Sequence, residues 1–182
     1  DDIESVCSHW LGGDVASSKL FKQFVQSTQI ERRYFSIPVE EVLSLNGLRG
    51  RAKLFEEHGP VLGEKALRAA LAQSKVSATE VGTLVFTSCS CPTIPAIDAL
   101  ILERVGLRRT TQRVPIYQHG CAGGVAGLAL ACKMAQSETV VVSSVELCSL
   151  VFQPANHTPA QIVGAALFGD GASAAVVTPD GS

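Results

Sequence analysis

The spacing of apolar residues changes along the chain, from helical repeats near its start to an alternation of helices and strands. Apolar side chains recur at helical spacing in residues 15–28 and 61–71, and residues 95–105 form a further amphipathic stretch. Short runs rich in β-branched residues predict strands at residues 82–87, 113–117, 139–145 and 172–178. Helices that alternate with such strands indicate an α/β fold, layered around a mainly parallel sheet.

Two segments depart from this simple pattern. The Glu-Glu-His-Gly-Pro run at residues 56–60 predicts a break after a polar N-terminal stretch, because Gly and Pro both interrupt helices. Residues 122–135 carry no charge before Lys133, so the helix expected there is apolar on every side. Such a helix is typical of the buried centre of a layered protein.

The length and composition indicate a single folded domain over residues 1–182. Of its 182 residues, 46% are hydrophobic and 18% charged, and the mean hydropathy is +0.25, which excludes disorder over most of the chain. The 15 basic and 17 acidic residues leave a net charge of −2, so no basic surplus is available to bind nucleic acid. No apolar run reaches the roughly 18 residues of a membrane-spanning helix.

The cysteines raise the question of disulfides or metal binding. They lie at positions 7, 89, 91, 121, 132 and 148. No signal-peptide pattern is present and four of them lie in apolar segments, which favours reduced thiols in a cytoplasmic protein. Cys89 and Cys91 form a lone Cys-x-Cys pair, without a second pair or a histidine at ligand spacing, so we expect no metal site.

The most informative stretch is YQHGCAGG, residues 117–124, in which Cys121 lies between a predicted strand and the apolar helix. Unpaired backbone N–H groups and the dipole at a helix N-terminus favour a thiolate, the form that attacks acyl groups. The neighbouring glycines would let an acyl carbonyl approach closely. The alternative is that Cys121 is a small buried residue and that the glycines serve helix packing. The spacing alone leaves both interpretations open. His119 is either a base for Cys121 or, more simply, a structural hydrogen-bonding residue.

Four motifs together resemble one family. They are IERRYF at residues 30–35, YQHGCAGG at 117–124, VELCSLVFQP at 145–154 and GAALFGDGASAAVV at 164–177. In this order and at these separations they resemble the N-terminal half of the type III polyketide synthases, the chalcone-synthase-like enzymes of the thiolase superfamily, in their bacterial form. The resemblance implies the αβα half of an αβαβα thiolase-like fold with a mixed, mainly parallel sheet.

The resemblance also implies roles for individual residues. Cys121 matches the nucleophile that takes an acyl group from coenzyme A, and Phe168 matches an aromatic gatekeeper between the coenzyme A tunnel and the reaction cavity. The other matched positions are expected to bind substrate: Gly164 lines the cavity, the small side chains of Cys89, Ser90 and Cys148 set its volume, and Ile94 reaches into the cavity of a dimer partner. Core packing is the alternative for each of them.

The chain lacks parts of the family pattern. The family's catalytic His and Asn lie in a C-terminal half that is absent from residues 1–182, and its first strand, central in the sheet, would precede Asp1. A sheet without its middle strand should expose apolar edges. Of the basic residues that contact coenzyme A phosphates in the family, only Lys22 offers a match. We therefore expect a piece of a longer synthase, inactive by itself.

The resemblance implies an acyltransferase that loads an acyl-CoA starter on Cys121 and extends it with malonyl-CoA by decarboxylative Claisen condensation, without a permanently bound cofactor. An alkylresorcinol, an alkylpyrone or a related aromatic compound is the expected product, and a homodimer is the expected assembly. A ketoacyl synthase III-like condensing enzyme is a close alternative. A non-catalytic thiolase-like interaction subunit is the alternative from another class.

Overall fold

The structure is a computed structural model that describes residues 2–90 and 93–179. The chain forms two compact units. The first contains the described residues of Asp1–Gly47 and Leu147–Asp170, and the second those of Leu48–Glu146 and Gly171–Ser182. Each unit has a buried hydrophobic cluster of its own.

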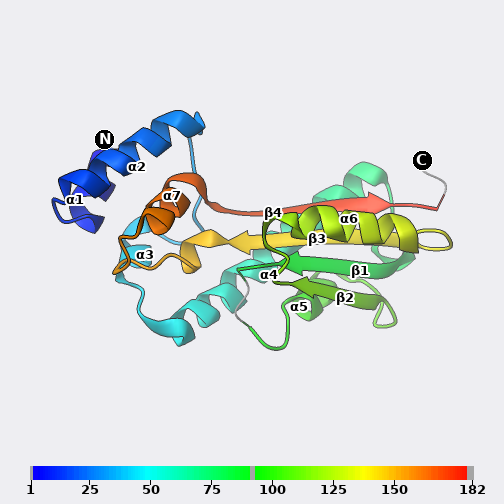
Figure 1. The fold of residues 1–182 in the computed structure, drawn as a ribbon. Coiled ribbons are helices and arrows are strands. Elements are labelled where there is room, and N and C mark those ends of the chain that lie inside the picture. Colours follow the sequence, from blue (N-terminus) through cyan, green and yellow to red (C-terminus); the bar gives the residue numbers. More distant parts are fainter. Residues whose placement is uncertain (1, 91–92, 180–182) are drawn as a thin grey trace. The chain divides into compact units, whose positions relative to one another are not determined.

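The second unit is built on a sheet whose described strands have the order β2-β1-β3-β4 (Figure 1). These strands are β1 (Val81–Ser88), β2 (Gln112–Tyr117), β3 (Thr139–Leu147) and β4 (Asp170–Val177). β1 pairs in parallel with both β2 and β3, whereas Figure 1 shows β4 running in the opposite direction. The sheet is therefore mixed and mainly parallel, which confirms the fold class and the strands expected from the sequence.

β1 is a central strand of this sheet and lies fully in the core. All eight of its residues are buried, and Thr83 and Thr87 are buried among its apolar side chains. β1 pairs directly with β3, with Val85 opposite Val142, so the sheet has no vacant place between these strands in the described chain. The gap expected in the middle of the sheet is therefore not found between β1 and β3, and the absence of the family's first strand stays a prediction.

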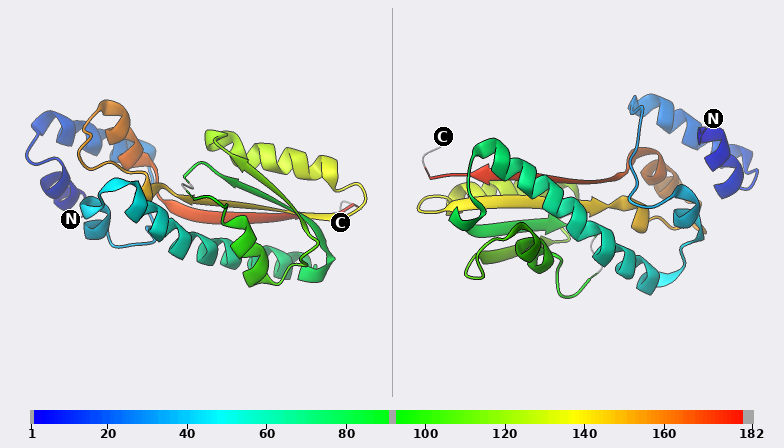
Figure 2. Two further views of the ribbon diagram at one scale, coloured as in Figure 1. Left: turned by 90° about the horizontal axis from the view of Figure 1, so that it is seen from below. Right: turned by 180° about the vertical axis from the view of Figure 1, so that it is seen from behind.

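Helices cover both faces of the sheet. α4 (Gly47–Ser74) and α5 (Asp98–Val105) lie on one face and α6 (Gly123–Met134) on the other, as the left view of Figure 2 shows. Contact between α4 and α5 is close, because a Cβ atom at Gly63 would lie 2.5 Å from Ile101 Cδ1. This layering is the αβα arrangement that the family resemblance implies.

The break predicted at residues 56–60 is wrong, because α4 continues through Gly59 and Pro60. A proline inside a helix removes one backbone hydrogen bond. Packing compensates, since both residues are buried and a Cβ atom at Gly59 would lie 2.9 Å from Ile97 Cδ1 of the segment before α5. The buried stripe of α4 repeats every four residues across the proline, through Phe55, Gly59, Gly63, Leu67 and Leu71. Burial of this stripe outweighs the lost hydrogen bond.

The helix predicted at residues 122–135 is confirmed as α6, but the prediction that it is buried on every side is wrong for this chain. Gly127 and Ala131 are buried on the side that faces the sheet, where they pack against side chains of β1 and β3. On the outward side, Val125 is 74% exposed and Leu128 is 44% exposed. No described segment covers this apolar face.

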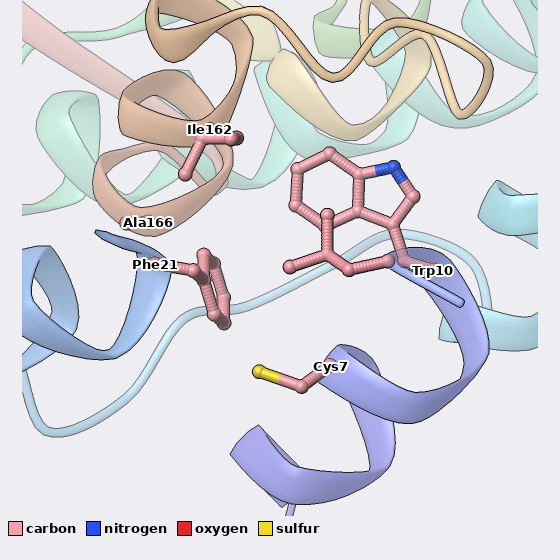
Figure 3. Close-up of a cluster of buried hydrophobic side chains, with 6 residues drawn as sticks. Cys7, Trp10, Phe21, Ile162 and Ala166 are labelled. Atoms are coloured by element: carbon pink, nitrogen blue, oxygen red, sulfur yellow. The ribbon is translucent and has the colours of Figure 1, made fainter. Parts of the chain in front are cut away.

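The first unit is helical. It contains α1 (Asp2–Trp10), α2 (Val15–Thr28), α3 (Val39–Ser44), α7 (Pro159–Leu167) and the 3₁₀ turn η3 (Cys148–Leu150), of which only α2 is predicted above. Trp10 packs edge-on against Phe21, and its Nε1 donates to the carbonyl oxygen of Pro154 at 2.9 Å. Both rings belong to the buried cluster of this unit, which Figure 3 shows: Cys7, Trp10, Leu11, Phe21, Ile162 and Ala166.

Candidate active site

Cys121 lies in a tight turn that joins the sheet to α6. β2 ends at Tyr117, and the 3₁₀ turn η2 (Gly120–Ala122) leads directly into α6. Gly120 has a φ of 57°, in the left-handed region that favours glycine. Cys121 is exposed, and the backbone N–H groups that have no partner within α6 follow it in the chain. The thiol thus lies between strand and helix, as the sequence predicts, and within reach of solvent.

Two hydroxyl groups of the sheet lie beneath the start of α6. Thr87 Oγ1 of β1 and Ser144 Oγ of β3 are hydrogen-bonded at 2.7 Å. A Cβ atom at Gly123 would lie 3.6 Å from Thr87 Cβ, and one at Gly124 would lie 3.6 Å from Ser144 Oγ. The two glycines therefore let the N-terminus of α6 rest on the sheet. His119 is exposed beside Gly123, and its role, base or structural residue, stays a prediction.

Glu146, near the end of β3, holds the loop that follows β1. Its Oε1 accepts a hydrogen bond from the backbone N–H of Cys89 at 2.8 Å, and its Oε2 accepts one from the N–H of Ser90 at 2.9 Å. The Ser90 hydroxyl also donates to Oε2, and the Ser88 hydroxyl does so at 3.4 Å. Glu146 is not among the residues predicted above. Its signal in the sequence is that it is the one charged side chain in β3, where an unpaired charge would be costly.

Cys89 and Cys121 are neighbours beyond the carboxyl ends of adjacent strands. β1 and β2 are parallel with Ser88 opposite Tyr117, and Cys89 follows Ser88 directly. The pKa of the Cys89 thiol is raised, first because the surrounding protein displaces water from the sulfur of this otherwise exposed residue, and then because the negative charge of Glu146 disfavours a thiolate. The Cys121 sulfur contributes further to this rise. The structure thus brings two of the predicted site residues together.

Ser90 and Ile94 both follow β1 in the chain, and they differ in exposure. Ser90 is buried at 7% exposure, in keeping with its bonds to Glu146, whereas Ile94 is 98% exposed. An apolar side chain so fully in solvent is available to a partner, and its expected contact with a second subunit stays a prediction.

Gly164 and Phe168 lie together at the C-terminal end of α7, in the first unit. The N–H of Phe168 donates to the carbonyl oxygen of Gly164 at 2.9 Å and ends the helix. A Cβ atom at Gly164 would lie 3.6 Å from Phe168 Cδ2, so the aromatic ring packs against the glycine. Phe168 is 45% exposed. The structure therefore pairs the predicted gatekeeper with a predicted cavity residue.

Asp170, in the same unit, ties the segment after α7 to the turn that contains Cys148. Its Oδ1 accepts from the N–H of Ser149 at 2.8 Å, and its Oδ2 accepts from Ser149 Oγ at 2.7 Å and from the N–H of Ser36 at 2.8 Å. Ser149 directly follows Cys148, and Phe168 precedes Asp170 by two positions. One carboxylate therefore fixes the backbone beside two candidate residues, a role that its motif does not reveal.

Groups that could hold ions or cofactors are sparse among the residues that the structure describes. No cluster of three or more His, Cys, Asp or Glu side chains suited to a metal ion occurs within residues 2–90 and 93–179. Lys22, the predicted phosphate contact, lies on α2 and is half-buried. None of the described cysteines, at positions 7, 89, 121, 132 and 148, forms a disulfide.

The helices of the described chain fall short of a membrane span. None of them is both long enough and apolar enough to cross a bilayer. The longest, α4, contains several charged residues.

The fold and the site together define a thiolase-like α/β domain with an exposed cysteine at the start of a helix. The sequence profile of the chalcone and stilbene synthases, N-terminal domain, matches residues 13–181. The chain is 32% identical over 165 residues to 1,3,6,8-tetrahydroxynaphthalene synthase of Streptomyces griseus, covering 89% of this chain and 44% of that protein. It is 27% identical over 173 residues to phloroglucinol synthase of Pseudomonas fluorescens, covering 93% and 50%.

Solved structures agree with this assignment. The crystal structure of 1,3,6,8-tetrahydroxynaphthalene synthase from Streptomyces coelicolor A3(2), a bacterial type III polyketide synthase, superposes with a TM-score of 0.88 at 27% identity, covering 97% of this chain and 51% of that one. The chain belongs to the chalcone and stilbene synthase family, and the bacterial relatives it resembles are type III polyketide synthases. It spans about half the length of these relatives.

Proposed function

We propose that the protein containing this chain is a type III polyketide synthase that loads an acyl group from a coenzyme A thioester on Cys121. The observation that carries the proposal is the position of this thiol. It is exposed, it lies two residues before the start of α6, and it falls within the residues that match the family profile. A thiolate at a helix N-terminus is stabilised by the helix dipole and by unpaired N–H groups.

The chemistry proceeds through covalent catalysis. The Cys121 thiolate attacks the starter carbonyl, a new carbon–sulfur bond forms, and coenzyme A leaves as its thiolate and takes up a proton. Malonyl-CoA loses carbon dioxide to give an enolate, whose carbon attacks the Cys121 thioester. The carbon–carbon bond forms as the bond to sulfur breaks, and Cys121 returns as a thiolate.

The donors that stabilise the enolate and the oxyanion are proposed to come largely from a C-terminal half. Such stabilisation is usually the largest single contribution to catalysis of acyl transfer. The outward face of α6 supports this dependence, because Val125 and Leu128 are apolar and exposed. We propose that the second half of the synthase covers them and that this chain alone is inactive.

Six residues of this chain are proposed to bind substrate. Cys89, Ser90 and Ile94 belong to the second unit, and Cys148, Gly164 and Phe168 to the first. Small side chains at Cys89 and Cys148 suit a long aliphatic starter and an alkylresorcinol or alkylpyrone product. The relatives named 1,3,6,8-tetrahydroxynaphthalene synthase favour another aromatic product. We propose coenzyme A thioesters as substrates in either case, in a cytoplasmic enzyme without a bound cofactor.

We also propose that the synthase is a homodimer. Ile94 supports this, because an apolar side chain at 98% exposure gains stability when a partner covers it. Sedimentation of the complete protein, compared with its Ile94→Lys variant, tests the assembly. We expect the parent protein to sediment as a dimer and the lysine variant to dissociate more readily. A parent protein that sediments as a monomer, or two proteins that dimerise equally well, would contradict the proposal.

Acyl labelling tests the nucleophile. The complete protein is incubated with an acyl-CoA, and the acylated peptide is located by mass spectrometry. We expect the label on Cys121 and its loss in Cys121→Ala, whereas Cys132→Ala, which removes another exposed thiol, should retain it. A label that persists in Cys121→Ala would overturn the assignment.

Assays with different substrates distinguish the proposed synthase from two alternative functions. A ketoacyl synthase III-like enzyme would accept its extender from an acyl carrier protein, so condensation with malonyl-CoA alone would not occur. A non-catalytic interaction subunit would not be labelled at all. The exposure of Cys121 favours an enzyme, because an interaction subunit has no use for an accessible nucleophile.

A further inference from the structure

Two exposed thiols lie side by side at the candidate active site, and acyl transfer needs only one of them. Cys89 directly follows β1, and Cys121 lies in the turn four residues after the end of β2, the strand that pairs in parallel with β1. A second thiolate beside the first could compete for the acyl group. The site therefore needs an interaction that makes the two thiols differ in reactivity.

Glu146 distinguishes the two thiols by its contacts. Its two oxygens accept the backbone N–H groups of Cys89 and Ser90, at 2.8 Å and 2.9 Å, and Ser90 adds its hydroxyl. The carboxylate is thereby fixed within reach of the Cys89 side chain. None of its hydrogen bonds goes to Cys121, among the contacts of the described residues.

We propose that Glu146 selects the reacting thiol: its carboxylate keeps Cys89 in the thiol form and leaves Cys121 as the acyl acceptor. Glu146 acts through Cys89 and is a positioning residue. The acyl part of this statement rests on the proposed function, whereas the difference between the two thiols does not. The physical reason is that a negative charge close to a sulfur opposes a second negative charge on it.

Loss of the Glu146 charge has a specific chemical consequence. A Cys89 thiolate could attack the carbonyl of an acyl group held on Cys121. A carbon–sulfur bond to Cys89 would form as the bond to Cys121 breaks, and Cys121 would leave as a thiolate. No oxidant or further reactant is needed for this transfer. The acyl group would then occupy a sulfur that does not precede a helix.

Alkylation by iodoacetamide tests the proposal without any requirement for synthase activity. The complete protein carries Cys91→Ser in every sample, because Cys91 would otherwise share a tryptic peptide with Cys89; Cys121 and Cys132 share the tryptic peptide of residues 114–133 and are distinguished by their fragment ions. Peptide mass spectrometry follows the alkylation rate of each cysteine from pH 7 to pH 9. A raised pKa means that the thiol form of Cys89 persists to higher pH, so its rate rises later than that of an ordinary thiol.

We expect Glu146→Gln to increase the alkylation rate of Cys89 several-fold near neutral pH and to move its pH profile downward, with little change at Cys121. Glu146→Asp keeps the charge and should preserve slow alkylation of Cys89. Glu138→Gln is the matched control, because Glu138 accepts from Thr83 Oγ1 at 2.5 Å at the opposite end of β1. It should change neither rate.

Two results would overturn the proposal. The first is an unchanged Cys89 rate in Glu146→Gln, in protein whose circular dichroism matches the parent. The second is a joint increase at Cys89, Cys121 and Cys132 in both Glu146 variants, which would mean that Glu146 only stabilises the fold. Failure of acyl labelling at Cys121 with the expected alkylation pattern would instead count against the proposed function alone.

Discussion

Gly127 of α6 approaches Thr87 of β1 so closely that a Cβ atom at the glycine would lie 2.8 Å from Thr87 Cγ2. The same Cβ atom would lie 3.2 Å from Val142 Cγ1 on β3. The absence of a side chain therefore sets the distance between α6 and the sheet. Because Cys121 lies two residues before the start of α6, this distance also places the candidate nucleophile.

We predict that Gly127→Ala destabilises the protein by about 1–3 kcal/mol, the usual cost of adding volume to a packed interface. Gly50→Ala is the matched control, since a Cβ atom at this helical glycine has no neighbour within 4 Å. That change should be neutral or stabilise by up to about 1 kcal/mol, because alanine favours helices. Urea denaturation measures both variants. Equal stability of the two would show that the α6 contact can relax.

Asp170 gives a second prediction, for the first unit. Asp170→Asn replaces an oxygen that accepts hydrogen bonds by an NH₂ group facing the donors of Ser149 or Ser36. We expect a loss of about 2–3 kcal/mol, typical of a broken hydrogen bond to a charged group. The change should also alter the product profile of the complete synthase, because Cys148 and Phe168 lose a common support.

Ser36→Ala is the control for this prediction. It keeps the backbone N–H that donates to Asp170 and removes a buried hydroxyl that has no hydrogen-bond partner in the described chain. Its stability should equal or exceed that of the parent in the same denaturation experiment. An Asp170→Asn protein as stable as Ser36→Ala would contradict the role of the carboxylate.

Much of the sheet can be predicted from the sequence, because strand patterns are local. The β-branched runs correspond to β1, β3 and β4, and the apolar run after Cys121 corresponds to α6. The course of α4 could not be predicted in this way. It continues through Pro60 because residues some forty positions later, such as Ile97 and Ile101, pack on its glycines.

The candidate site shows the same division. Cys121 can be found from its neighbours in the chain, since a glycine-rich turn before an apolar helix is a local signal. Glu146 and Asp170 cannot, because each binds a loop that is distant in the sequence, with Glu146 57 positions from Cys89. Parallel pairing of β1 and β3 creates the first of these contacts. Local spacing therefore identifies a nucleophile more readily than the residues that position it.

Asp98 provides a test by pH. It is fully buried at the start of α5, and Arg113 Nη1 lies 3.1 Å from its Oδ2. Burial raises the pKa of Asp98 above its ordinary value of 3.8, and the Arg113 charge opposes this rise only in part. The folded state therefore binds the proton more tightly than the unfolded state. The resulting stability is full below pH 3.8 and is lost as the pH rises through the folded pKa.

We predict that Asp98→Asn, which cannot ionise, gains stability relative to the parent as the pH rises from 4 to 7. Denaturation curves at several pH values give this difference. Arg113→Gln removes the opposing charge, so the loss of stability in that variant should extend to higher pH. A difference between Asp98→Asn and the parent that stays constant over this range would contradict the raised pKa.

The outward face of α6 leads to the last prediction. Val125 and Leu128 leave an apolar surface in solvent, and Cys132 is an exposed thiol on the same helix. Burial of such side chains stabilises a protein by roughly 1.5–3 kcal/mol each, so their coverage by a second half of the synthase would be strongly favourable.

We expect Cys132 to be alkylated several-fold more slowly in the complete protein than in this chain expressed alone. Leu128→Lys, which places a charge on that surface, should restore fast alkylation of Cys132 in the complete protein, whereas Gly50→Ala on the opposite side of the sheet should not. Equal rates in the complete protein and in the isolated chain would mean that this face stays open to solvent.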